Sequence, residues 1–139
     1  EGPTLLANVR MCPNVPEQHA IQTALSGYQS INEYIHPGGR FYEQSKTAWR
    51  LLNEIPGVSC VEPRGALYCF PRLDPEVYAI KDDEQFVIDL LRAKKILVTH
   101  GTGFNWFEPD HFRLVTLPDL DTLTEAIGRI ADFLATQRV

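Results

Sequence analysis

The stretch HFRLVTL at residues 111–117 alternates large apolar side chains with others and predicts a β-strand that ends before Pro118. Because successive side chains of a strand point to opposite faces, Arg113 shares a face with Val115 and Leu117. A guanidinium on an apolar face stays charged and requires an anion, and its planar fork matches a carboxylate through two parallel hydrogen bonds. An internal ion pair with an Asp or Glu, or a side chain that reaches solvent at the strand end, would also satisfy Arg113.

Around this strand, the chain supplies a few more short strands and several helices. Helical periodicity and capping residues predict helices from Pro16 to Gly27, over 31–35, over 40–55, from about Asp82 to Lys95, and after a cap at Asp119 or Asp121. Strands are expected at Val58–Glu62, Ala66–Phe70, Ile96–Thr99 and Phe112–Leu117, with Pro63-Arg64-Gly65 as a hairpin connection between the first two. We therefore predict an α+β fold, a small and mainly antiparallel sheet with helices packed on one face.

The composition is that of an ordinary globular domain and argues against several functions. The 139 residues are 44% hydrophobic and carry a net charge of −5, and the scattered Lys and Arg residues argue against a nucleic-acid partner. No apolar run approaches the roughly 20 residues that span a bilayer, and no signal segment opens the chain, so we expect no membrane association. The three cysteines, Cys12, Cys60 and Cys69, lack C-x-x-C pairing and indicate reduced core thiols in a cytoplasmic protein.

Two further segments carry candidate site residues. Pro63-Arg64-Gly65-Ala66-Leu67-Tyr68 places a glycine between two predicted strands. There it supplies a positive backbone angle, room for a ligand, or an ordinary turn. The segment GTGFNW at residues 101–106 exposes two aromatic side chains beside polar groups, and it either lines a pocket or forms a structural loop.

The residue pattern contains no clear catalyst. The four histidines lack the spacing of metal ligands. Lys46, in Gln44-Ser45-Lys46, lies on the polar side of a predicted helix, without the desolvation or cationic neighbour that activates a lysine nucleophile. We therefore expect neither a metal site nor a covalent catalyst in these residues.

Three segments, taken in order, resemble a known family. Residues 10–18 (RMCPNVPEQ), Pro63-x-Gly65-Ala66-Leu67-Tyr68, and Phe112-Arg113-Leu114 are similar to corresponding stretches of the class I/II aminotransferases of fold type I. The run Val98–Phe104 is similar to the family segment that precedes its arginine-bearing strand. The resemblance covers essentially the whole chain and is strongest to the bacterial alanine aminotransferase group, which includes proteins labelled probable aspartate aminotransferases.

This resemblance implies roles for residues of the chain. Arg113 matches the arginine that grips the α-carboxylate of the amino-acid substrate, and Gly65 and Tyr68 match the strand that closes over the substrate. Arg10 and Asn14 match a segment that approaches the active site of the other subunit in related dimers. The substrate-binding candidates are Arg10, Asn14, Gly65, Tyr68, Phe104 and Arg113.

The resemblance also implies a larger enzyme that uses pyridoxal 5'-phosphate. Residues 16–139 would be its C-terminal small domain and residues 1–15 a lead-in from the large domain. Such enzymes are homodimers that act on amino acids and 2-oxo acids, with alanine and 2-oxoglutarate favoured here over aspartate and 2-oxoglutarate. The family's cofactor lysine and other cofactor-binding residues have no match, and the chain opens at Glu1 without a methionine, so we expect an inactive piece of the parent enzyme. Thr102-Gly103 departs from the family's usual small-residue run, which puts the shape of the substrate pocket in doubt.

Two functions of other classes compete with this interpretation. A stand-alone α+β module could sense an amino acid through Arg113, and micromolar binding without a cofactor would identify it. A purely structural or dimerisation domain would expose apolar surface and self-associate. Both explain fewer of the motifs than the aminotransferase resemblance does.

Overall fold

The computed structural model describes residues 2–5 and 14–139, which fall into two compact units, Glu1–Glu33 and Tyr34–Val139. No described helix is both long enough and apolar enough to cross a membrane. The predicted division into a lead-in over 1–15 and a small domain over 16–139 refers to the architecture of a larger protein, and it stays a prediction.

The first unit holds the helix predicted to begin near Pro16. Helix α2 spans Val15–Ser26 with a proline in its first turn, where the missing N–H would have no helical partner. It ends at Gly27, whose N–H donates to the Thr23 carbonyl at 3.0 Å. No residue of α2 is buried, so its apolar side chains face outward. A second short helix, α3 (Ile31–Ile35), follows as predicted.

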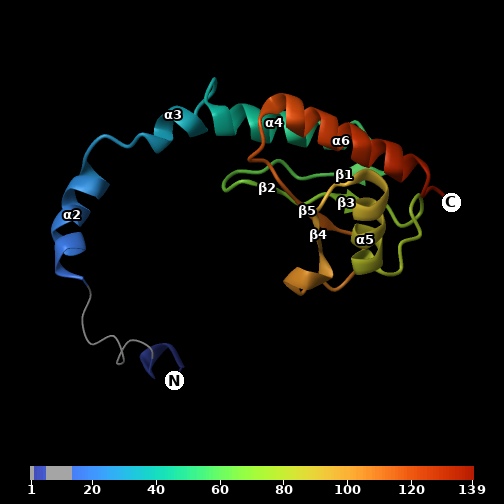
Figure 1. Ribbon diagram of the computed structural model, residues 1–139, viewed down its shortest axis with the longest axis horizontal. Coiled ribbons are helices and arrows are strands. Elements are labelled where there is room, and N and C mark those ends of the chain that lie inside the picture. The colour runs from blue at the N-terminus through green and yellow to red at the C-terminus, as the bar shows by residue number, and fades with distance from the viewer. Residues whose placement is uncertain (1, 6–13) are drawn as a thin grey trace. The chain divides into compact units, whose positions relative to one another are not determined.

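The second unit contains three long helices and five short strands. In chain order it comprises α4 (Arg40–Asn53), β1 (Val58–Ser59), β2 (Tyr68–Cys69), β3 (Arg72–Leu73), α5 (Asp83–Lys94), β4 (Thr99–His100), the 3-10 helix η1 (Thr102–Phe104), β5 (Phe112–Val115) and α6 (Leu120–Ala135). One antiparallel sheet has the order β2-β5-β4, and β1 pairs with β3 in a second antiparallel sheet. An isolated antiparallel bridge between Arg72 and His111 joins the two sheets (Figure 1).

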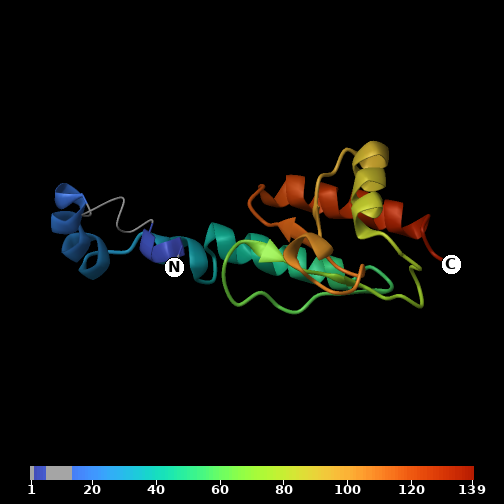
Figure 2. The same ribbon diagram turned by 90° about the horizontal axis from the view of Figure 1, so that it is seen from below.

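Strand β5 separates a covered face of the sheet from an open one. Leu114 is buried beside its partner Cys69 of β2, whereas Arg113 and Val115 face the other way, with Val115 beside Tyr68. Residues of α4, α5 and α6 form one hydrophobic core with the buried strand residues. Helices α4 and α6 run alongside each other, and α5 runs across them (Figures 1 and 2). The predicted α+β fold with helices on one sheet face is confirmed.

The last helix, α6, shows how the sequence directs this packing. Of the two predicted caps, Asp119 is the one used, because its carboxylate accepts hydrogen bonds from the Thr122 N–H at 2.9 Å and the Thr122 hydroxyl at 2.8 Å. Burying each large aliphatic side chain of the helix contributes about 1.5–3 kcal/mol. The helical spacing of the sequence also places Leu120 on the apolar stripe of this helix, but Leu120 is 42% exposed. The buried members are Leu123, Ile127, Ile130, Phe133 and Leu134.

The two strands predicted at Val58–Glu62 and Ala66–Phe70 do not form a hairpin. Only two residues of each run pair, β1 with β3 and β2 with β5. Pro63 has no N–H to donate to a neighbouring strand, and Ala66 adopts a φ of 56°, outside the extended region. The prediction of a hairpin connection at Pro63-Arg64-Gly65 was therefore wrong, and this segment belongs to an irregular loop.

Strand β4 also differs from its prediction. The expected strand Ile96–Thr99 moves to Thr99–His100, because pairing with β5 reaches only these two residues. Of the apolar side chains before them, Val98 is buried, at 5% exposure, whereas Leu97 is 75% exposed. Strand β3 was not predicted, because two residues are too short to show a period.

Helix α5 begins where the sequence indicated, but with half of the expected capping box. Asp82 accepts a hydrogen bond from the Gln85 N–H at 2.9 Å, as predicted. The Gln85 side chain donates forward to Asp89 at 2.8 Å instead of returning to the Asp82 backbone.

Two of the three cysteines can be placed. Cys60 and Cys69 are free, buried thiols in the core, as predicted. Cys12 lies outside the described residues.

Candidate functional site

Arg113 lies on the open face of the sheet, in the middle of β5 and opposite Thr99 of β4. Its Nε atom is buried and has no hydrogen-bond partner. Within residues 2–5 and 14–139, none of the ion pairs includes Arg113, so the internal ion pair that the sequence left open is not formed. A buried donor without an acceptor costs about 1–3 kcal/mol, and an anion at this edge would recover that free energy.

Two aromatic rings pack against the Arg113 guanidinium. The Cζ atom lies 4.6 Å from the ring centroid of Tyr68 on β2 and 4.4 Å from that of Phe104 in η1. Rings stacked on a guanidinium cover its faces and leave the N–H groups along its edge available to a planar acceptor. Three elements therefore meet at a cation whose remaining donors suit a carboxylate.

The position of Phe104 depends on the turn at Gly101. The Gly101 N–H donates to the His111 carbonyl at 2.9 Å, and a Cβ at Gly101 would lie 2.8 Å from that oxygen. Only glycine fits this close approach. The next residue, Thr102, donates its N–H and its hydroxyl to the carboxylate of Asp83, at 2.9 Å and 2.8 Å. The chain is thus fixed on both sides of the turn that presents Phe104.

The buried carboxylate of Asp110 contacts three neighbouring side chains. It accepts hydrogen bonds from Trp106 Nε1 at 3.0 Å and Arg72 Nε at 2.8 Å, and its Oδ1 lies 2.6 Å from His111 Nδ1. Burial opposes the charged form, but the hydrogen bonds from Arg72, His111 and Trp106 outweigh it and lower the pKa of Asp110. Phe70 stacks on His111 with ring centroids 4.8 Å apart, so the side chains around Asp110 are held by both polar and apolar contacts.

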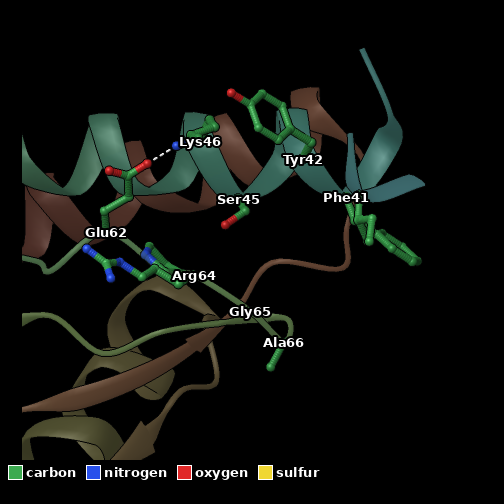
Figure 3. A pocket seen from close by; sticks show the side chains of 10 residues that line it. Phe41, Tyr42, Ser45, Lys46, Glu62, Arg64, Gly65 and Ala66 are labelled. Carbon is green, nitrogen blue, oxygen red and sulfur yellow. Dashed lines mark ion pairs between the residues drawn. The ribbon is translucent and has the colours of Figure 1, made fainter. Parts of the chain in front are cut away.

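A cavity of about 500 Å³ opens between α4 and the loop that carries Gly65 (Figure 3). The ion pair between Lys46 of α4 and Glu62 lies in the wall of this cavity, and the side chain of Arg64 extends from the loop. The positive φ of this loop falls on Ala66, at 56°, and not on Gly65. A Cβ at Gly65 would meet nothing within 4 Å, so of the roles considered for this glycine only room for a ligand or an ordinary turn remains.

The described lysines do not offer an anchor for an aldehyde cofactor. Lys46 is ion-paired with Glu62, whereas a lysine nucleophile needs desolvation or a cationic neighbour. Lys94 lies 3.8 Å from Asp132, and Lys95 donates to the Arg92 carbonyl at 3.1 Å. In the described part of the chain, no three His, Cys, Asp or Glu side chains gather to hold a metal ion.

The matching family model identifies the chain's relatives. The model for aminotransferase class I and II matches residues 9–130. The chain belongs to the class I and II aminotransferases. This family assignment agrees with the resemblance found in the motifs around Gly65 and Arg113.

Individual relatives support the same assignment for this aminotransferase chain. It is 66% identical over 138 residues to the "Alanine aminotransferase" of Mycobacterium tuberculosis, covering 99% of this chain and 32% of that protein. It is 57% identical to the "Glutamate-pyruvate aminotransferase AlaA" of Escherichia coli K12, covering 97% of this chain and 33% of that protein. A solved aminotransferase from Escherichia coli superimposes with a TM-score of 0.87 at 56% identity, over 97% of this chain and 33% of that one. The chain thus spans about a third of the length of its curated relatives.

The predicted site residues of this aminotransferase chain do not all lie together. Tyr68, Phe104 and Arg113 are in direct contact. Gly65 lines the cavity beside α4. Asn14 lies in the first unit, where its side chain donates to Glu17 at 2.9 Å. Arg10 lies outside the described residues.

Sequence reasoning missed two residues that shape the candidate site of this chain. Asp83 was read only as part of a helix start, and Asp110 was not singled out, yet both are buried, at 4% and 8% exposure. Their donors lie 19 residues from Asp83 and up to 38 residues from Asp110 along the chain, so no local pattern marks them. One available signal was that Asp110 lies between Trp106 and His111, both of which carry N–H donors.

Proposed function

We propose that this chain is the C-terminal, substrate-carboxylate-binding part of a pyridoxal-phosphate-dependent aminotransferase. In this proposal residues 16–139 form the small domain, and residues 1–15 lead in from the large domain. The observation that carries it is the buried Nε of Arg113, which has no acceptor while two aromatic rings pack against its guanidinium. Membership of the class I and II aminotransferases supports the same function.

The role of Arg113 is to hold the α-carboxylate of the substrate. Its planar fork donates two parallel hydrogen bonds to the two carboxylate oxygens and fixes the rotation of the substrate as well as its position. A fixed carboxylate sets the direction of the bonds at the α-carbon, and orientation of this kind lowers the barrier of the reaction. Gly65 and Tyr68 belong to the segment that closes over the bound substrate and excludes water.

The cofactor requires groups that the described residues do not provide. Pyridoxal phosphate, when bound, supplies an electron sink for the reacting α-carbon. Lys46, the lysine beside the cavity, is paired with Glu62 and does not fit the role of cofactor lysine. We therefore place the cofactor lysine and the phosphate-binding groups in a part of the enzyme outside this chain, and we expect the chain alone to be inactive.

The substrates proposed are alanine and 2-oxoglutarate, with aspartate and 2-oxoglutarate as the alternative. The names of the relatives in Mycobacterium tuberculosis and Escherichia coli support alanine or glutamate and pyruvate as reactants. The enzyme is proposed to be a cytoplasmic homodimer. Arg10 and Asn14 would then approach the active site of the other subunit, where Arg10 would assist the substrate side chain.

Replacement of Arg113 in the full-length, cofactor-loaded protein tests this function. Arg113→Lys keeps the charge but loses the planar fork, so kcat/KM for alanine should fall on the order of 10- to 100-fold. Arg129→Lys is the matched control, because Arg129 is an exposed arginine of α6 that pairs with Glu125. Equal kcat/KM values for the two variants would refute the proposed role of Arg113.

Titration of the 139-residue chain separates the proposal from the sensor alternative. An amino-acid sensor would bind alanine with micromolar affinity without a cofactor. The proposed domain should bind alanine only weakly in a calorimeter, because the cofactor supplies much of the site. Micromolar binding would favour the sensor.

A further inference from the structure

The buried carboxylate of Asp83 attaches the turn that carries Phe104 to helix α5. Asp83 is the first residue of α5 and is 4% exposed. Its Oδ2 accepts from the Thr102 N–H at 2.9 Å, and its Oδ1 accepts from the Thr102 hydroxyl at 2.8 Å. An aspartate in the first turn of a helix ordinarily faces solvent and stabilises the helix dipole. Asp83 instead points inward and uses both oxygens on a neighbouring segment.

The contacts continue from Thr102 to Arg113 in two steps. Thr102 starts η1, which is closed by hydrogen bonds from Phe104 N–H to the Gly101 carbonyl at 2.9 Å and from Asn105 N–H to the Thr102 carbonyl at 3.0 Å. Phe104, two residues after Thr102, lies 4.4 Å from the Cζ atom of Arg113. Because η1 is a single short turn, displacement of Thr102 displaces the Phe104 ring with it.

The ring of Phe104 contributes to the rotamer of Arg113. On the open face, Tyr68 and Phe104 are the two rings that contact the guanidinium, and in the described residues no ion pair fixes it. A cation–aromatic contact is worth about 0.5–2 kcal/mol, depending on exposure. Loss of one ring therefore allows the long arginine side chain other rotamers, and time spent in them reduces the time its N–H edge is placed for a carboxylate.

We infer that Asp83 is a positioning residue for substrate binding, which acts through Thr102 and Phe104 to hold Arg113 ready for the α-carboxylate. The inference rests on the function proposed for Arg113. It assigns to the start of α5 a role beyond helix capping, which Asp82 already performs by accepting from the Gln85 N–H.

The adjacent aspartates provide a matched pair for the test in the full-length, cofactor-loaded protein. Asp83→Asn cannot accept hydrogen bonds from both donors of Thr102 through two carboxylate oxygens, whereas Asp82→Ala removes the cap of the same helix without touching η1. Thr102→Val removes the hydroxyl bond alone, and Thr102→Ser retains it. Propionate is a carboxylate without an amino group. Its affinity therefore measures carboxylate binding by Arg113 separately from the transamination reaction.

The inference predicts a specific pattern of inhibition constants. Asp83→Asn and Thr102→Val should raise the inhibition constant of propionate and the KM for alanine by about five- to tenfold, with a smaller change in kcat. Thr102→Ser and Asp82→Ala should stay within about twofold of the unchanged protein, although Asp82→Ala lowers the melting temperature. This pattern separates positioning from stability, because the cap variant is destabilised and still binds.

Two other results would overturn the inference. Propionate inhibition unchanged in Thr102→Val and in Asp83→Asn, with only the melting temperature reduced, would make Asp83 a purely structural residue. If Asp83→Asn does not fold, the comparison of Thr102→Val with Thr102→Ser decides alone, and equal inhibition constants refute the inference. An Arg113→Lys variant that keeps normal propionate affinity would instead refute the proposed function.

Discussion

Arg72 and Asp110 link the two sheets of the domain through a hydrogen bond of 2.8 Å from Nε to Oδ2. Arg72 lies in β3 and Asp110 lies just before β5, so this bond reinforces the single backbone bridge between Arg72 and His111. The same carboxylate also holds Trp106 and His111. The charge of this buried group therefore adds a side-chain link to the backbone bridge between the two sheets.

Acid should weaken this link. Burial opposes the charged form of Asp110, but the hydrogen bonds from Arg72, His111 and Trp106 lower its pKa below that of an unfolded aspartate, which is about 3.9. A lowered folded pKa contributes stability that is present above about pH 4 and is lost as the pH falls through the folded value. The free energy of unfolding, measured by urea denaturation, should therefore fall from pH 5 to pH 3.

Replacing Asp110 isolates its share of this pH dependence. Asp110→Asn should reduce the free energy of unfolding at pH 7 by about 1–3 kcal/mol, and the difference from the unchanged chain should shrink at pH 3. Asp121→Asn serves as the control, because Asp121 is an exposed residue in the first turn of α6. A pH-independent difference for Asp110→Asn would contradict this account.

Neighbouring leucines of α5 should differ sharply in their contribution to the core. Leu90 is fully buried, whereas Leu91 is 39% exposed. Leu90→Ala should lower the free energy of unfolding by about 2–5 kcal/mol, because it removes buried surface and leaves a cavity. Leu91→Ala should change it by less than about 1 kcal/mol. Equal losses in urea denaturation would show that the helix packs through another face.

Alanine should have opposite effects at two glycines. At Gly101 a Cβ would lie 2.8 Å from the His111 carbonyl oxygen, so Gly101→Ala should destabilise the domain by more than about 1 kcal/mol. At Gly128, within α6, a Cβ meets nothing within 4 Å, so Gly128→Ala should stabilise it by about 0.5–1 kcal/mol. Melting temperatures of the two variants check both signs, and a stabilised Gly101→Ala would disprove the close approach.

The 139-residue chain should not form a defined adduct with pyridoxal phosphate. Lys46 is paired with Glu62, Lys81 and Lys95 are exposed, and the half-buried Lys94 lies near Asp132. Borohydride reduction after incubation should give only scattered, substoichiometric labelling by mass spectrometry. Lys46→Arg should leave that labelling nearly unchanged. A saturable one-to-one adduct, lost in Lys46→Arg, would reverse the assignment of the cofactor lysine to another part of the enzyme.

Helices and the buried side of the sheet could be predicted because their signals are local. The α6 stripe repeats at helical spacing, Asp119 lies at the helix start, and residues 112–115 alternate in burial as a strand should. Pairing could not be predicted in the same way. Strand β2 pairs with β5, about 45 residues further along the chain, and two-residue strands carry no period that would indicate a partner.

The candidate site also has one part that local sequence could predict and another that it could not. Arg113 could be predicted because a cation among apolar strand residues is unusual within a few positions of sequence. Its contact with Phe104 could not be derived from either local segment, because it depends on a turn held by Asp83 and on the close approach at Gly101. Buried polar groups that join distant segments leave no trace in local hydrophobicity, and this is why Asp83 and Asp110 were missed.

The hydrogen bond between Trp106 and Asp110 gives the site an optical signal. The chain has two tryptophans, and the other, Trp49, donates to the Cys60 carbonyl on the helix-covered side of the domain. A Trp49→Phe variant would leave Trp106, two residues after Phe104, as the remaining tryptophan of the 139 residues. Its emission depends on the polarity around the indole ring, so a carboxylate that settles on Arg113 and tightens the turn can be followed by fluorescence without any turnover of substrate.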